Sequence, residues 1–128
     1  KNMSEWRKHM AELKERLMGG ILNNIPDTVL NGPKVGAPHI LNISFLGTMG
    51  EILLHALESK NIYVSTGSAC SSHKSEKSHV LKAMGKSLEE QDGAIRFSLS
   101  PFVSQEAIDY TLEVLYKEVK EIRKFVRR

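Results

Sequence analysis

The sequence is poor in cysteine, in aromatic residues and in long hydrophobic stretches. Its single cysteine, Cys70, makes an internal disulfide impossible, and nothing in the cysteine content points to secretion. Aromatic residues make up 6% of the chain. No hydrophobic run approaches the roughly 18 residues that a membrane-spanning helix requires. We therefore expect no membrane contact.

The composition favours one compact domain over residues 1–128. Hydrophobic residues account for 41% and charged residues for 26%, values that argue against disorder. The net charge is only +3, and most basic residues alternate with acidic ones, so we expect no direct nucleic-acid partner. The basic end of the chain, residues 123–128, fits a helix C-terminus whose cations complement the helix dipole. A nucleic-acid contact is the alternative, but no aromatic residues interleave there.

Hydrophobic periodicity predicts the element order α-β-β-α-β-α-β-α. The expected helices start at Ser4, at Thr48 (with Glu51 in a capping box), at residue 79 and at Ser104. Gly19 and Gly20 are expected to end the first helix. In the second helix, Ile52, Leu53, Ala56 and Leu57 are expected to face inward.

The expected strands cover residues 28–30, 39–45, 62–64 and 94–99. In the last of these, Ile95, Phe97 and Leu99 share one face, while Arg96 and Ser98 share the other. With few strands and uneven alternation, the pattern predicts a two-layer α+β domain. We expect a short, mostly antiparallel sheet with helices packed mainly on one face.

The most unusual segment is the loop predicted over residues 65–77, which contains Ser-Thr-Gly-Ser-Ala-Cys at 65–70. Small neighbours leave the Cys70 sulfur accessible, and His73 and Lys74 are close enough in sequence to stabilise its thiolate. One interpretation is a nucleophilic or sulfur-carrying cysteine on a mobile loop. The alternative is an inert cysteine in a turn.

Four segments together resemble one family. They are residues 40–45 (Ile-Leu-Asn-Ile-Ser-Phe), residues 65–70, residues 78–85 (Ser-His-Val-Leu-Lys-Ala-Met-Gly) and residues 95–99 (Ile-Arg-Phe-Ser-Leu). In order and approximate spacing, they are similar to the C-terminal small domain of NifS/IscS-type cysteine desulfurases, which are class V aminotransferase-fold enzymes. The chain would then be one domain of a longer enzyme. Lys77 stands where the family usually has proline, and Ser100 where it usually has glycine.

The resemblance implies an enzyme that uses pyridoxal phosphate as an electron sink and L-cysteine as its substrate. Cys70 would attack the substrate sulfur as a thiolate, giving a cysteine persulfide and alanine. The sulfur would pass to an acceptor protein, either an iron–sulfur scaffold or a tRNA-thiolation enzyme. The family also implies a cytoplasmic homodimer.

Arg96 has two interpretations. Its strand position alone is equally compatible with a surface salt bridge in the sheet. In the family, the arginine of the Arg-Phe-Ser-Leu motif binds the substrate α-carboxylate, a task that suits the bidentate guanidinium.

We expect neither a cofactor-binding residue nor a metal ligand in this chain. Ser72-His73-Lys74 imitates the family's Schiff-base lysine motif, but it lies inside the cysteine loop and is not followed by the rest of that motif. We expect the Schiff-base lysine to lie outside this chain, so that the piece alone is inactive. Cys70, His73 and His79 match no standard zinc spacing.

Two alternative functions remain open. One is a stand-alone, non-catalytic module that carries sulfur or binds a sulfur-transfer partner. The other is selenocysteine lyase chemistry on the same scaffold.

Overall fold

The computed structural model describes residues 3–32, 39–66, 92–100 and 102–125. Its elements are α1 (Met3–Asn24), β1 (Thr28–Leu30), β2 (Ile40–Phe45), α2 (Gly50–Glu58), β3 (Ser65–Thr66), β4 (Ala94–Ser98) and α5 (Gln105–Phe125). The helix expected from residue 79 lies outside the described residues. Each of the other expected elements has a counterpart, but the bounds of α1, β2, α2 and β4 are shifted, and β3 does not overlap the strand expected over residues 62–64.

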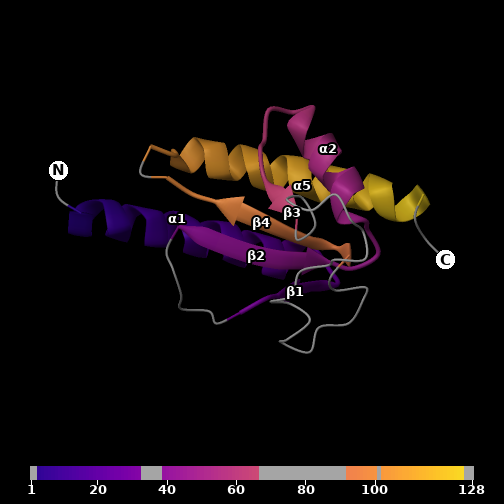
Figure 1. Ribbon diagram of the computed structural model, residues 1–128, viewed down its shortest axis with the longest axis horizontal. Helices are drawn as coiled ribbons and strands as arrows, with labels where there is room; N and C mark the ends of the chain where they lie inside the picture. The colour runs from indigo at the N-terminus through magenta and orange to yellow at the C-terminus, as the bar shows by residue number, and fades with distance from the viewer. Residues whose placement is uncertain (1–2, 33–38, 67–91, 101, 126–128) are drawn as a thin grey trace.

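The strands form one four-stranded sheet in the order β1-β2-β4-β3, and all three pairings are antiparallel. The two long helices, α1 and α5, lie together on one side of this sheet (Figure 1). Helix α2 packs against α5 and β3. The two-layer α+β fold with an antiparallel sheet is therefore confirmed.

The hydrophobic core lies between the sheet and the helices. Strands β2 and β4 contribute the fully buried Ile43, Phe45 and Ile95, and the rings of Phe45 and Phe97 meet edge to face with centroids 6.4 Å apart. Arg96 and Ser98 alternate with these residues and are exposed. The predicted alternation of β4 is thus confirmed, and it directs Arg96 away from the core.

Helix α1 continues through the glycine pair that we expected to end it. Gly20 lies where α1 meets α5, and a Cβ atom added there would be 2.6 Å from Leu112 Cδ1. The prediction of a helix stop at Gly19–Gly20 was wrong because Gly20 permits close helix packing instead of a left-handed cap. Ser4, the expected N-cap of this helix, lies inside it, because α1 begins at Met3.

Three local predictions around α2 and β3 also need correction. Thr48 does not cap α2, because its Oγ1 donates to the Phe45 carbonyl at 2.6 Å and Met49 occupies the N-cap position without a side-chain bond. Ile52 is 44% exposed rather than inward-facing. The strand expected over residues 62–64 lies instead at Ser65–Thr66, where the chain meets β4.

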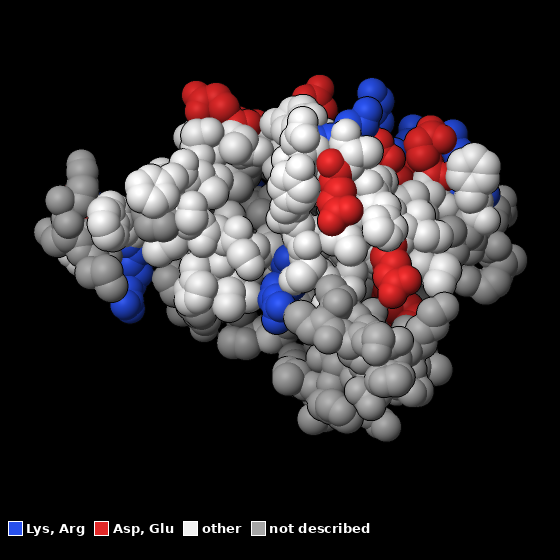
Figure 2. Space-filling model, turned by 45° about the horizontal axis from the view of Figure 1, so that its top comes forward, with Lys and Arg blue, Asp and Glu red and all other residues white. Residues whose placement is uncertain are grey.

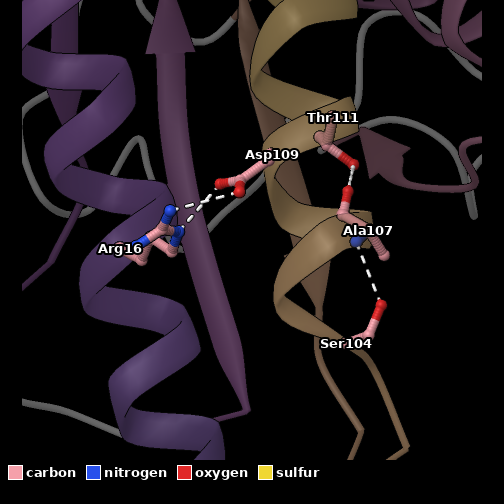
Figure 3. A network of polar contacts seen from close by, with 5 residues as sticks. All are labelled: Arg16, Ser104, Ala107, Asp109 and Thr111. Carbon is pink, nitrogen blue, oxygen red and sulfur yellow. Dashed lines mark hydrogen bonds and ion pairs between the residues drawn. The ribbon is translucent and has the colours of Figure 1, made fainter.

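Polar contacts fix the start of α5 and its distance from α1 (Figure 3). Ser104 Oγ accepts a hydrogen bond from the Ala107 N–H at 3.0 Å, which confirms Ser104 as the N-cap. Arg16 of α1 donates from Nε and Nη2 to the two carboxylate oxygens of Asp109, at 2.8 and 3.1 Å. This fork lowers the pKa of Asp109 and raises the pKa of Arg16, the hydrogen bond being the largest cause.

The glycine pair supplies a matched stability test. Gly19→Ala should raise the free energy of unfolding by up to about 1 kcal/mol, since alanine favours the helix and the nearest atom to the new Cβ, Asn23 Nδ2, is 3.9 Å away. The free energy of unfolding of Gly20→Ala should be about 1–3 kcal/mol lower than that of Gly19→Ala, because the new methyl group overlaps Leu112. Urea denaturation measures both. Equal stabilities for the two variants would show that Leu112 makes room for the methyl group at little cost, so that close packing does not require glycine at position 20.

The Arg16–Asp109 pair predicts a pH-dependent contribution to stability. Because folding lowers the Asp109 pKa, the stabilisation is present above the unfolded carboxyl's ordinary value of 3.8 and disappears as the pH falls through the lower folded value. Asp109→Asn should therefore lower Tm at neutral pH, and the difference should shrink in acid and in high salt. Glu113→Gln, an exposed change on the same helix, is the control. A Tm difference independent of pH would contradict this assignment.

Candidate functional site

Of the two predicted site residues, the structure describes only Arg96. Cys70 lies outside the described residues, and so do its neighbours His73, Lys74 and Lys77 and the helix expected from residue 79. The role of Cys70 therefore stays a prediction. The described chain reaches Thr66, four positions before the cysteine.

Arg96 lies in the middle of β4 on the polar face of the sheet. Its Nε donates to Ser65 Oγ at 3.1 Å, and Ser65 is its direct partner on β3. The guanidinium therefore lies next to the strand from which the cysteine-containing segment departs. Since Nε is occupied by Ser65, the remaining four N–H groups on the two Nη atoms are left for other acceptors.

Four polar residues, one from each strand or strand end, form a row across the sheet. We call Asn31, Asn42, Arg96 and Ser65 the polar row. The backbone N–H of Asn31 donates to the Asn42 carbonyl at 2.9 Å, Asn42 pairs with Arg96, and Arg96 pairs with Ser65. Residues directly opposite each other in a sheet point to the same face.

Side-chain hydrogen bonds link the row at both ends. Asn31 Nδ2 donates to Asn42 Oδ1 at 3.0 Å and to Ser44 Oγ at 2.9 Å. Asn31 is 8% exposed and Ser44 is fully buried, so this end of the row is shielded, whereas Arg96 at the other end is exposed. Sequence analysis did not single out Asn31, Asn42 or Ser65, because their proximity follows from strand order and register.

Among the described residues, ion pairs join Arg16 to Asp109, His55 to Glu58 and Lys124 to Glu121, and Arg96 belongs to none of these three. A surface salt bridge stays the alternative interpretation of Arg96. Figure 2 shows acidic and basic side chains interspersed along one side of the molecule rather than gathered in a patch of one sign. Within the part of the chain that the structure describes, the exposed Arg96 guanidinium lies beside the polar Ser65 and opposite Asn42, surroundings that suit an anionic ligand.

The lysines among the described residues lie on α1, on α5 or in the turn after α2, and none of them lies on the sheet beside Arg96. Across residues 3–32, 39–66, 92–100 and 102–125, no group of three or more His, Cys, Asp or Glu is placed to hold a metal ion. No helix in this part of the chain is long and apolar enough to cross a membrane.

Comparison with known proteins gives consistent matches. The chain is 43% identical over 125 residues to a "Cysteine desulfurase IscS" of Clostridium botulinum, covering 95% of this chain and 32% of that protein. It is 45% identical over 115 residues to a "Cysteine desulfurase IscS" of Pectobacterium carotovorum, covering 89% and 28%. Among solved structures, a "NifS-like protein" aligns with a TM-score of 0.74 and 34% identity, covering 95% of this chain and 29% of its own.

The chain spans about a third of the length of the curated relatives that it matches. A family model described as "Aminotransferase class-V" matches residues 1–111, which is most of the chain. The predicted resemblance to NifS/IscS-type proteins is therefore confirmed, and the chain belongs to the class-V aminotransferase family.

Proposed function

We propose that the chain is the C-terminal part of a pyridoxal phosphate-dependent cysteine desulfurase, which takes sulfur from L-cysteine and releases alanine. The relatives that match at 43–45% identity are named cysteine desulfurases, which supports this activity. When bound in the remainder of the enzyme, the cofactor supplies an electron sink. Its Schiff-base lysine would also come from outside this chain.

The observation that carries the proposal is the position of Arg96. Its guanidinium lies on an exposed sheet face, where its Nη atoms donate to none of the described residues, and its partner Ser65 lies five residues before Cys70. Four residues from Thr66 to Cys70 span at most about 14 Å of extended chain. The length of the chain therefore keeps the thiol within reach of a substrate whose carboxylate is bound by Arg96.

The two residues divide the work. Arg96 would hold the α-carboxylate of L-cysteine and so orient the substrate, reducing the entropy lost in reaching the reactive geometry. The Cys70 thiolate would attack the substrate sulfur, forming an S–S bond as the carbon–sulfur bond breaks. The released carbon takes up a proton, so one thiol and one cysteine become one persulfide and one alanine.

The sulfur would then move to an acceptor protein, such as an iron–sulfur scaffold or a tRNA-thiolation enzyme. A persulfide on a surface thiol transfers its outer sulfur by attack of an acceptor thiolate, as in thiol–disulfide exchange. That route requires an exposed cysteine rather than a buried one.

We further propose that the complete enzyme is a cytoplasmic homodimer.

Cys70→Ala tests the sulfur-carrying role. After the full-length, cofactor-loaded enzyme is mixed with L-cysteine, mass spectrometry should find a mass increase of one sulfur atom on wild type and none on the variant. Alanine production should fall to background, because the attacking thiolate is absent. Ser98→Ala, an exposed change on β4, is the control. A Cys70→Ala enzyme that releases alanine at the normal rate would refute the assignment.

Arg96→Ala tests the carboxylate-binding role. Loss of a charged hydrogen-bond donor should lower kcat/KM for L-cysteine by about one to two orders of magnitude. The free energy of unfolding should change by no more than about 0.5 kcal/mol, since an exposed side chain outside an ion pair contributes little. Steady-state kinetics and urea denaturation measure the two effects. A large loss of stability with unchanged kcat/KM would assign Arg96 a structural role instead.

A further inference from the structure

In the polar row, Asn42 and Arg96 are direct partners across the β2–β4 pairing, and both side chains carry N–H donors. Asn42 Oδ1 already accepts from Asn31 Nδ2 at 3.0 Å. The sheet order puts Asn31 on the β1 side of Asn42 and Arg96 on the β4 side. Because an amide carries its oxygen and nitrogen on opposite corners, the bond to Asn31 turns Asn42 Nδ2 away from β1.

Asn42 and Arg96 therefore lie directly opposite each other, and within the described ranges neither Asn42 Nδ2 nor the Arg96 Nη atoms donate a hydrogen bond. The Asn42 amide has two N–H donors, and the Arg96 guanidinium retains four on its Nη atoms. Two donors cannot hydrogen-bond to one another. Cβ atoms of directly opposite residues are about 5 Å apart, so a small anion can contact both side chains.

The buried end of the row indicates why Asn42 keeps this orientation. Asn31 is more than nine-tenths buried and donates both of its amide hydrogens, to Asn42 and to Ser44. Its Oδ1 is buried without a hydrogen-bond partner among the described residues. An unpaired buried acceptor is unfavourable. What asparagine contributes at position 31 is therefore the pair of hydrogen bonds that its Nδ2 donates.

We propose that Asn42 is a second carboxylate-binding residue beside Arg96, with its amide held in the donating orientation by Asn31. This inference rests on the proposed function, since it takes the ligand to be the α-carboxylate of an amino acid. A carboxylate has enough lone pairs to accept from the Arg96 fork and from Asn42 Nδ2 together. Asn42 then favours ligands that carry a carboxylate. Asn31 acts as a positioning residue, because it holds the Asn42 amide in the donating orientation.

The test measures how strongly the full-length, cofactor-loaded enzyme prefers L-alanine to L-alaninamide, as the ratio of their dissociation constants from isothermal titration. The two probes differ only in the carboxylate, so a general loss of structure does not mimic a selective change. Asn42→Ala should reduce the preference about tenfold, the size expected for one hydrogen bond to a charged group. Asn42→Asp, of nearly the same size, should reduce it at least as much because it adds a negative charge.

Asn31→Ser should reduce the preference as well, and adding it to Asn42→Ala should cause no further loss, since both act through one amide. The matched control is Ser98→Ala on the same exposed face of β4, which should leave the preference unchanged. Arg96→Ala gives the reference loss.

If Arg96→Ala abolishes the preference while Asn42→Ala or Asn42→Asp retains it, our inference is overturned and the proposed role of Arg96 stands. If Arg96→Ala also retains the preference, the carboxylate site itself is absent. Persulfide formation on Cys70 is measured separately, so that part of the proposed function is judged independently.

Discussion

The pairing of β2 with β4 is the constraint on which the core and the candidate site both depend. One register sets Ile43 opposite Ile95 in the core and Asn42 opposite Arg96 on the other face. Because successive strand residues point to opposite faces, a slip of one residue would move Arg96 into the core and Ile95 to solvent. The burial of apolar side chains therefore holds the polar row in register, without the row itself needing to contribute much stability.

Local signals in the sequence predicted the parts of the fold that depend on neighbouring residues. The alternation of Ile95, Arg96 and Phe97 placed Arg96 on the outer face, and Ser104 was identified as an N-cap from its own helix. Predictions failed where a distant or competing partner decided the outcome. Gly20 continues the helix because Leu112 packs against it, and Thr48 bonds to the carbonyl of Phe45 rather than capping α2.

The candidate site likewise combines a residue that local sequence signals identify with residues that only the fold brings together. Arg96 belongs to a recognisable motif, and its face follows from strand periodicity alone. Asn42 and Ser65 also lie in segments that carry the family resemblance, but no role was predicted for them or for Asn31, and their relation to Arg96 exists only once the order β1-β2-β4-β3 is known. An asparagine that follows a short strand carries no signal that it will meet a second asparagine eleven positions later. Strand topology, rather than residue type, brings these groups together.

The shortness of β3 has a consequence for the chain that leaves it. This edge strand has two residues: Thr66 is buried beside the first turn of α2, while Ser65 is held by the Arg96 guanidinium. Two kinds of contact therefore fix the point at which the chain leaves the sheet: burial of one residue and a side-chain hydrogen bond to the other. The candidate carboxylate-binding residue and the start of the cysteine-containing segment thus share one anchor, so that a change at Ser65 would disturb both at once.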